Sequence, residues 1–200
     1  MEIKAADVKA LREATGAGMM DCKQALVDAE GDVERAKQLL RERGLASAKK
    51  YGTRAAEEGL VEAYLHQPDP HLPSKLGVLI ELNCATDFVA KTEQFRNLAR
   101  EIAMHISFAK PQYLAREEVP EDVVKSEREV YAKQAEGKPE NVVEKMVAGK
   151  LEGFFAEVCL LDQKYIRDDK KSIQQLLDEA SSELKEPVKI RRFSWFRVGA

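Results

Sequence analysis

ELNCATDFVAK, the stretch from Glu81 to Lys91, joins two different kinds of predicted secondary structure. The apolar residues before it alternate as in a β-strand, and an amphipathic helical pattern begins just beyond it. The four residues Thr86-Asp87-Phe88-Val89 are therefore predicted to form a turn between two rigid elements. A phenylalanine on such a turn is poorly placed to join the buried face of either element. We expect the Phe88 side chain to be presented to a binding partner.

The residues on either side of this turn predict an α+β domain. Residues 60–65 and 76–82 have strand-like patterns, and three prolines between them predict a hairpin loop over 66–74. After the turn, Thr92 can cap a helix whose apolar residues share one face: Phe95, Leu98, Ala99, Ile102 and Ile106. Further helices are expected over 121–135, 140–157 and 172–184. A last strand, over 188–198, is expected at the edge of a small antiparallel sheet.

The N-terminal residues predict a small bundle of three short helices. Their apolar residues recur at helical spacing: Val8 and Leu11 in the first, Met19, Cys22, Leu26 and Ala29 in the second, and Val33, Ala36, Leu39 and Leu40 in the third. Gly16, Gly31 and Gly44 are expected to end these helices, and Asp32 to cap the third. We expect a bundle of the ubiquitin-associated type over 1–44, a linker over 45–55 and the α+β core over 56–200.

The composition narrows the class of partner. The chain has 200 residues, and its 32 basic and 35 acidic side chains are interleaved, so no basic face for nucleic acid is evident. No apolar run approaches the roughly 20 residues of a membrane helix, and the charged N-terminus predicts no signal peptide. Cys22, Cys84 and Cys159 lack C-x-x-C spacing, which fits a reducing cytosol. We expect a cytoplasmic protein that binds another protein, without nucleic-acid or membrane contact.

The sequence contains no pattern typical of an enzyme. Gly16-Ala17-Gly18 superficially resembles a phosphate-binding loop, but a helical pattern precedes it and no G-K-[ST] follows. The three histidines share no ligand spacing, and no Ser or Cys has an identifiable base. We therefore expect no catalytic residue, no metal site and no cofactor. For His105, which follows the apolar stripe of its helix, a structural or interface role is expected.

The residues alone also allow simpler interpretations of the turn and of the bundle. Thr86 and Asp87 can cap the following helix, and Phe88 can fold back into the core. Met19 and Met20 can both belong to the core of the bundle, although methionine is also adaptable at protein interfaces.

Three long strings resemble translation elongation factor Ts: LREATGAGMMDCKQAL over 11–26, ELNCATDFVAK over 81–91, and EKMVAGKLEGFFAEVCLLDQ over 144–163. The resemblance covers nearly the whole chain and indicates a short form with a single core. It implies a guanine-nucleotide exchange factor rather than an enzyme. Such a factor binds the GTPase elongation factor Tu in its GDP-bound and nucleotide-free states. It dislodges magnesium and promotes GDP release, so that GTP can bind.

The resemblance also implies roles for individual residues. The family's T-D-F-V tetrapeptide, here Thr86, Asp87, Phe88 and Val89, is inserted near the magnesium site of the GTPase and helps to dislodge the ion. Ala85 stands before it, where Glu or Gln was expected.

The remaining assignments concern binding surfaces. Arg12, Met19 and Met20 match the region that docks on the nucleotide domain of the GTPase, and His105 lies in AMHIS, which resembles a helix of the family's core domain. The single core suggests a homodimer, although the C-terminal cysteine of a covalently linked dimer is absent. The main alternative is a helical adaptor that binds without catalysing exchange, and a nucleotide-binding enzyme comes third.

Overall fold

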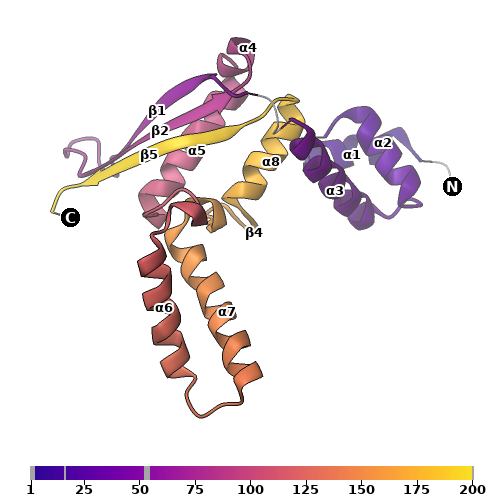
Figure 1. Cartoon of the computed structure of the whole chain (residues 1–200). Helices are drawn as coiled ribbons and strands as arrows, with labels where there is room; N and C mark the ends of the chain where they lie inside the picture. Colours follow the sequence, from indigo (N-terminus) through magenta and orange to yellow (C-terminus); the bar gives the residue numbers. More distant parts are fainter. Residues whose placement is uncertain (1–2, 16, 52–54, 200) are drawn as a thin grey trace. The chain divides into compact units, whose positions relative to one another are not determined.

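The computed structural model describes residues 3–15, 17–51 and 55–199 (Figure 1). The chain divides into two compact units. One comprises Met1–Gly59, Asn83–Thr92 and Gln175–Lys189, and the other comprises Leu60–Leu82, Glu93–Gln174 and Ile190–Ala200. The turn at Thr86 thus belongs to the same unit as the N-terminal helices. The domain boundaries predicted after residues 44 and 55 stay a prediction, and residues 52–54 lie outside the described part.

The N-terminal bundle consists of α1 (Ala5–Thr15), α2 (Met19–Asp28) and α3 (Val33–Tyr51), which confirms the three predicted helices. Its core contains the buried side chains Val8, Leu11, Cys22, Ala25, Leu26, Ala29 and Ala36. Asp32 caps α3 as predicted, because its Oδ1 accepts from the backbone N–H groups of Glu34 (2.9 Å) and Arg35 (3.0 Å). Gly31, with φ of 88°, follows α2 in a backbone conformation that glycine adopts without strain.

Three predictions about this bundle are wrong. Met19 and Val33 do not join the core, because 45% and 43% of their side chains are exposed. Each is the first residue of its helix, and the buried stripe begins only at the next turn. Gly44 does not end α3, which continues to Tyr51. A single glycine costs a helix only about 1 kcal/mol, and the alanines and lysines that follow it favour helix. Gly16 lies outside the described residues.

A three-stranded antiparallel sheet forms the framework of the core, with strand order β1-β2-β5. The strands are β1 (Glu58–His66), β2 (Leu76–Cys84) and β5 (Lys189–Arg197). In the central strand Val78, Ile80, Leu82 and Cys84 are buried while Leu79 is exposed, so the predicted alternation is confirmed. The strand β5 lies at an edge, also as predicted.

The helix α5 (Glu93–Ala109) crosses one face of this sheet in Figure 1. Its predicted stripe is buried at Phe95, Ala99, Ile102 and Ile106. The indole N–H of Trp195 donates to the carbonyl oxygen of Pro111 (3.1 Å), which ties β5 to the end of α5. The buried face of the sheet and the apolar stripe of the helix therefore make the core of this unit.

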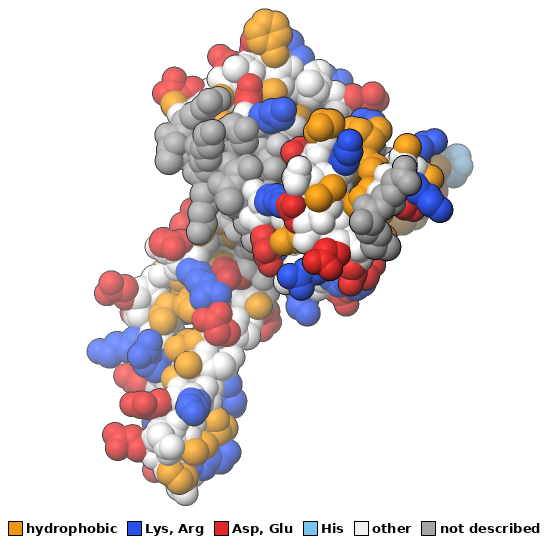
Figure 2. Space-filling view, turned by 90° about the vertical axis from the view of Figure 1, so that its right-hand side faces the viewer, with side chains coloured by type: hydrophobic (Ala, Val, Ile, Leu, Met, Phe, Trp, Pro, Cys, Tyr) orange, Lys and Arg blue, Asp and Glu red, His pale blue; other side chains and the backbone are white. Residues whose placement is uncertain are grey.

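The helices α6 (Glu121–Gln134) and α7 (Glu140–Val158) form an antiparallel pair, and both lie within one residue of their predicted ends. At the bottom of Figure 2 this pair carries acidic and basic side chains interspersed with hydrophobic ones. The helix α8 (Ile173–Leu184) was also predicted. The small hairpin of β3 (Lys164–Tyr165) and β4 (Asp168–Ser172) was not, because two residues are too few to show an alternating pattern.

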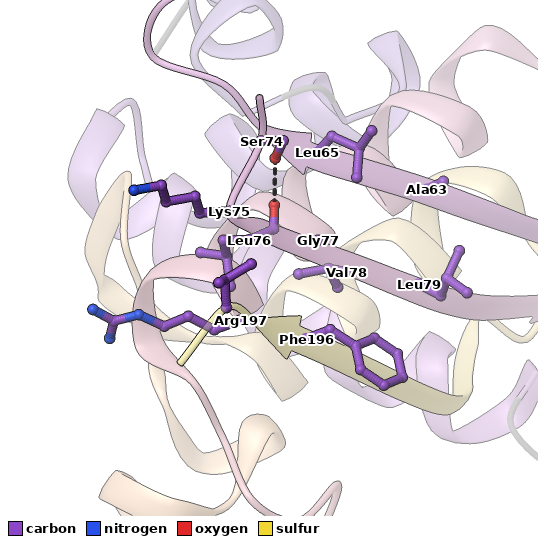
Figure 3. A pocket seen from close by; sticks show the side chains of 11 residues that line it. Ala63, Leu65, Ser74, Lys75, Leu76, Gly77, Val78, Leu79, Phe196 and Arg197 are labelled. Atoms are coloured by element: carbon purple, nitrogen blue, oxygen red, sulfur yellow. Dashed lines mark hydrogen bonds between the residues drawn. The ribbon is translucent and has the colours of Figure 1, made fainter. Parts of the chain in front are cut away.

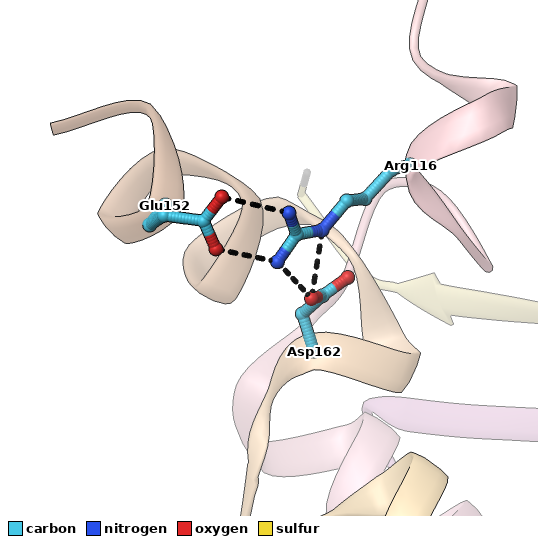
Figure 4. A network of polar contacts seen from close by, with 3 residues as sticks. All are labelled: Arg116, Glu152 and Asp162. Atoms are coloured by element: carbon cyan, nitrogen blue, oxygen red, sulfur yellow. Dashed lines mark hydrogen bonds and ion pairs between the residues drawn. The ribbon is translucent and has the colours of Figure 1, made fainter. Parts of the chain in front are cut away.

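Arg116 fixes the base of the α6–α7 pair (Figure 4). Its guanidinium donates to both carboxylate oxygens of Glu152 on α7 (2.9 and 2.7 Å) and to Oδ1 of Asp162 (2.9 and 2.6 Å). The hydrogen bonds to Asp162 and then to Glu152 raise the pKa of Arg116 above its usual range. Arg116 also lies over the ring of Phe155, 4.9 Å from its centroid. The arginine thus joins two carboxylates that lie 36 and 46 residues beyond it in the sequence.

Candidate partner-binding turn

The predicted turn is a single turn of helix, α4 (Asp87–Ala90), that begins directly after Thr86. Thr86 is extended and caps this turn, because its Oγ1 accepts from the backbone N–H of Val89 (3.4 Å). At the other end, Thr92 Oγ1 donates to the carbonyl oxygen of Val89 (2.8 Å). The capping role that the residues alone suggested for Thr86 is therefore confirmed, and it is compatible with presentation of the next residues.

Phe88 projects from this turn with 80% of its surface exposed, the highest value among the large hydrophobic residues of the described part of the chain. The alternative interpretation, in which Phe88 folds back into the core, is wrong. A large apolar side chain that stays in water on an ordered turn is a feature of binding surfaces rather than of folding. Val89, the next residue, is half-buried.

Asp87 carries a negative charge beside Phe88. The Nζ of Lys91 donates to its Oδ2 at 2.5 Å, one helical turn away. This hydrogen bond lowers the pKa of Asp87 below its usual value and raises that of Lys91. Both side chains reach solvent, so salt screens their attraction and a competing charge can separate them.

Glu186, which no sequence pattern indicated, attaches the turn to the segment after α8. Its Oε2 accepts from the backbone N–H groups of Ala85 (3.2 Å) and Thr86 (3.1 Å), and its Oε1 accepts from Thr86 Oγ1 (2.6 Å). Glu186 lies 100 residues beyond Thr86, so no local pattern could have indicated the contact. Ala85, where Glu or Gln was expected, thus contributes its backbone to this network.

Cys84 supports the turn from the strand side. Its Sγ donates to the carbonyl oxygen of Thr86 (3.2 Å), and burial raises the pKa of the thiol. A buried thiol with a raised pKa is a poor nucleophile. Cys84 therefore acts here as a small buried side chain with a weak hydrogen bond, and no reactivity follows from it.

The three bundle residues singled out in the sequence lie around the connection between two helices. Arg12 is in the last turn of α1, and Met19 and Met20 open α2. All three are exposed, and 72% of the surface of Met20 faces solvent. The interpretation of both methionines as core residues is therefore wrong. An exposed methionine offers an adaptable apolar contact, and an exposed arginine carries a fixed positive charge.

His105, by contrast, is buried in α5, with 1% of its surface exposed. Its Nε2 bonds to the side-chain oxygen of Gln163 (3.0 Å), and Nδ1 has no partner within the described residues. Burial lowers the pKa of the imidazole, partly offset by the bond to Gln163. The structure thus places His105 in the interior, in the other unit from the turn and the bundle residues.

Among the described residues, no group of three or more His, Cys, Asp or Glu side chains is arranged to hold a metal ion. Within residues 3–15, 17–51 and 55–199, none of the helices combines the length and hydrophobicity that a membrane-spanning segment needs.

The sequence matches the family model for elongation factor Ts over residues 6–200. It is 53% identical to the elongation factor Ts of Moorella thermoacetica over 199 residues, which cover 98% of this chain and 96% of that protein. The corresponding protein of Caldanaerobacter subterraneus subsp. tengcongensis is 52% identical, with 98% of this chain and 97% of that protein covered. That of Carboxydothermus hydrogenoformans is 54% identical over 194 residues, with coverages of 96% and 87%.

A helical bundle, an α+β core and an exposed turn, together with these full-length matches, define the class as translation elongation factors. The chain belongs to the elongation factor Ts family.

Proposed function

We propose that this chain is a guanine-nucleotide exchange factor for elongation factor Tu and acts in the cytoplasm. It binds the GDP-bound GTPase, dislodges the magnesium ion and promotes release of GDP, so that GTP can bind. It changes the rate of an exchange without converting a substrate chemically. The observation that carries the proposal is the exposure of Phe88 on an ordered turn, next to an ionised carboxylate.

The proposed mechanism follows from how a GTPase holds its nucleotide. A phosphate-binding loop and a magnesium ion neutralise the charge on the phosphates of GDP. Phe88 would enter between the elements that hold the ion, while Asp87 would exchange its Lys91 partner for polar groups around the magnesium site. Loss of the ion leaves phosphate charge uncompensated, and GDP dissociates faster. By linkage, nucleotide must then weaken the binding of the factor by the same ratio.

One side chain cannot supply all the binding free energy that faster GDP release requires. Accelerating GDP release about 10⁴-fold needs roughly 5.5 kcal/mol of differential binding in the transition state for release. A single buried phenylalanine supplies about 2–4 kcal/mol at an interface. Arg12, Met19 and Met20 would supply further contacts as the anchor on the nucleotide domain. For His105 the proposal is indirect: from its buried position it would support the core that the partner contacts.

We also propose that the chain forms a homodimer through the exposed face of its sheet. Leu65, Leu79 and Phe196 lie on this face with exposed fractions of 67%, 47% and 71%, and they line a shallow hollow with Ala63 and Val198 (Figure 3). Glu81 follows two residues after Leu79 on β2, hence on the same side, and accepts from Nε of Arg192 (2.7 Å). An apolar centre beside a charged pair is the usual composition of an interface between copies.

Release of a fluorescent GDP analogue from elongation factor Tu, followed by stopped flow with rising amounts of the chain, tests the exchange proposal. Acceleration that saturates supports it. Binding to the GTPase without acceleration would instead establish the adaptor alternative and overturn the proposal. An enzyme that binds nucleotide itself would take up the analogue in the absence of elongation factor Tu, and we expect no such uptake.

A further inference from the structure

All three donors to the carboxylate of Glu186 belong to two consecutive residues, Ala85 and Thr86, where the turn begins. It accepts from the N–H of Ala85 (3.2 Å), the N–H of Thr86 (3.1 Å) and the hydroxyl of Thr86 (2.6 Å). The hydroxyl bond has the short length that is typical of a hydrogen bond to an ionised acceptor, whereas the two N–H bonds are longer. One side chain thus fixes the backbone at the point where the strand β2 ends and the helical turn α4 begins.

Glu186 is itself held firmly. Lys185, with φ of 57°, ends α8 in the left-handed conformation, and Pro187 follows Glu186 as a buried residue with a restricted φ. The next N–H, that of Val188, donates to Oγ of Ser181 in the last turn of α8 (3.0 Å). The segment between α8 and β5 therefore has little freedom, and it presents the carboxylate from a fixed position.

The helical turn α4 needs stabilising contacts from another segment of the chain. The helix α4 has only four residues, and a single helical turn is not stable by itself because its nucleation fixes more dihedral angles than its hydrogen bonds repay. Phe88 contributes little, since four fifths of its surface is in water. Packing of the Phe88 side chain itself therefore does not determine where it points, and the polar contacts of Thr86 contribute to its position together with the half-buried Val89.

The hydrogen bonds of Thr86 connect Glu186 to the backbone on both sides of Phe88. Its hydroxyl donates its single hydrogen to Glu186 and accepts from the N–H of Val89 (3.4 Å). Because the hydrogen is committed to the carboxylate, the oxygen lone pairs remain directed at the first turn of α4. The N–H of Val89 is thus fixed on one side of Phe88 and the N–H of Thr86 on the other.

We propose that Glu186 is a positioning residue for Phe88, which keeps the turn in the conformation that elongation factor Tu binds before the two proteins meet. This inference rests on the proposed exchange function. A protein whose binding-competent conformation is only partly populated loses apparent affinity by that fraction. Preorganisation by Glu186 avoids this loss and the entropy cost of ordering the turn on binding.

The test is a double-mutant cycle in the GDP-release assay with the full chain. Glu186→Ala should lower the second-order rate constant of acceleration about tenfold, if the competent turn is then populated in about one molecule in ten. In a Phe88→Ala background the same change should cost less than twofold, because Glu186 acts through Phe88. Glu129→Ala, which removes an exposed carboxylate of α6 to which we assign no role, should leave the rate unchanged.

Two further measurements separate positioning from folding. Hydrogen exchange followed by NMR should speed up at the amides of Ala85, Thr86 and Val89 in Glu186→Ala, while the amides of the bundle core stay protected. Glu186→Gln keeps the size of the side chain but loses one acceptor oxygen, so it should give an intermediate rate. If Glu186→Ala does not fold, by circular dichroism, Glu186→Gln takes its place in the cycle.

The outcomes distinguish this inference from the function it rests on. If the unmodified chain accelerates release and Phe88→Ala impairs it, equal losses from Glu186→Ala in both backgrounds, or no loss, overturn the positioning role alone. Unchanged amide exchange at Ala85 and Thr86 overturns it as well. If the unmodified chain does not accelerate release at all, the exchange function fails and the role of Glu186 in it fails too.

Discussion

Replacing Phe88 by alanine should separate the contribution of this side chain to binding from its contribution to folding. The side chain is 80% exposed on a turn whose hydrogen bonds are made by its neighbours, Thr86 and Val89. Its removal therefore leaves the fold almost intact. The apolar surface that would enter the partner, in contrast, is lost almost completely.

The exposed fraction of Phe88 sets the binding free energy that Phe88→Ala is expected to remove. A phenylalanine can bury about 200 Å², so an exposed fraction of 80% leaves about 160 Å² for a partner to cover. At about 25 cal/mol per Å² this corresponds to about 4 kcal/mol, of which the retained Cβ accounts for about a quarter. A loss of about 3 kcal/mol lowers the second-order rate constant of GDP release about 100-fold. The remaining fifth, roughly 40 Å², limits the change in unfolding free energy to about 1 kcal/mol.

The assay is stopped-flow release of a fluorescent GDP analogue from elongation factor Tu, with urea unfolding of each variant measured alongside. Phe108→Ala is the matched control, because Phe108 on α5 is 74% exposed and has no assigned role. We expect the control to retain the full rate. A loss of less than threefold in Phe88→Ala, or an equal loss in Phe108→Ala, would refute the assignment of Phe88 as the wedge.

Three other predictions concern folding and assembly. Asp32→Ala should lower the unfolding free energy in urea by about 1 kcal/mol, because Asp32 accepts from two N–H groups at the start of α3. The buried His105 has a pKa below its ordinary value of 6.5, so below pH 6.5 the unfolded chain binds a proton that the folded chain excludes. Stability should then fall as the pH falls from 6.5 toward the folded-state pKa, by up to about 1.4 kcal/mol per pH unit. Phe196→Asp should shift a homodimer toward monomer in sedimentation equilibrium, because it places a charge on the exposed sheet face.

Each of these has a control. Asp32→Ser retains an oxygen that can cap α3 and should recover most of the stability, and if it is as unstable as Asp32→Ala, capping is not the cause. His105→Gln removes the titrating group, so a pH slope between 6.5 and 5.5 identical to that of the unmodified chain would contradict the assignment to His105. Arg191→Asp reverses a charge at an exposed position of β5 outside the hollow, and equal dissociation of both variants would speak against an apolar contact at this face.

Local rules account for the parts of the fold that were predicted correctly. The buried stripe of α5, with Phe95, Ile102 and Ile106, follows from a helical repeat that nothing in the sequence interrupts. The alternation of β2 follows from a period of two. The cap at Asp32 needs only atoms within three residues of it. The exposure of Phe88 was predictable for the same reason, since the elements on both sides already had complete apolar faces.

The features that sequence patterns did not predict depend on contacts between segments that are far apart in the sequence. Glu186 and Thr86 are 100 residues apart, and no periodic pattern records that a carboxylate will accept from two particular backbone N–H groups. Met19 has the spacing of a core residue, yet its position at the start of α2 leaves it exposed, which depends on where the neighbouring helices end. For His105 a structural or interface role was predicted, and only the packing around α5 shows that it is buried against Gln163. Periodicity and capping are local properties of the chain, and they determined the elements and the exposed turn. The carboxylate that holds this turn was decided only in the tertiary structure, because a hydrogen bond across a hundred residues depends on how the whole unit packs.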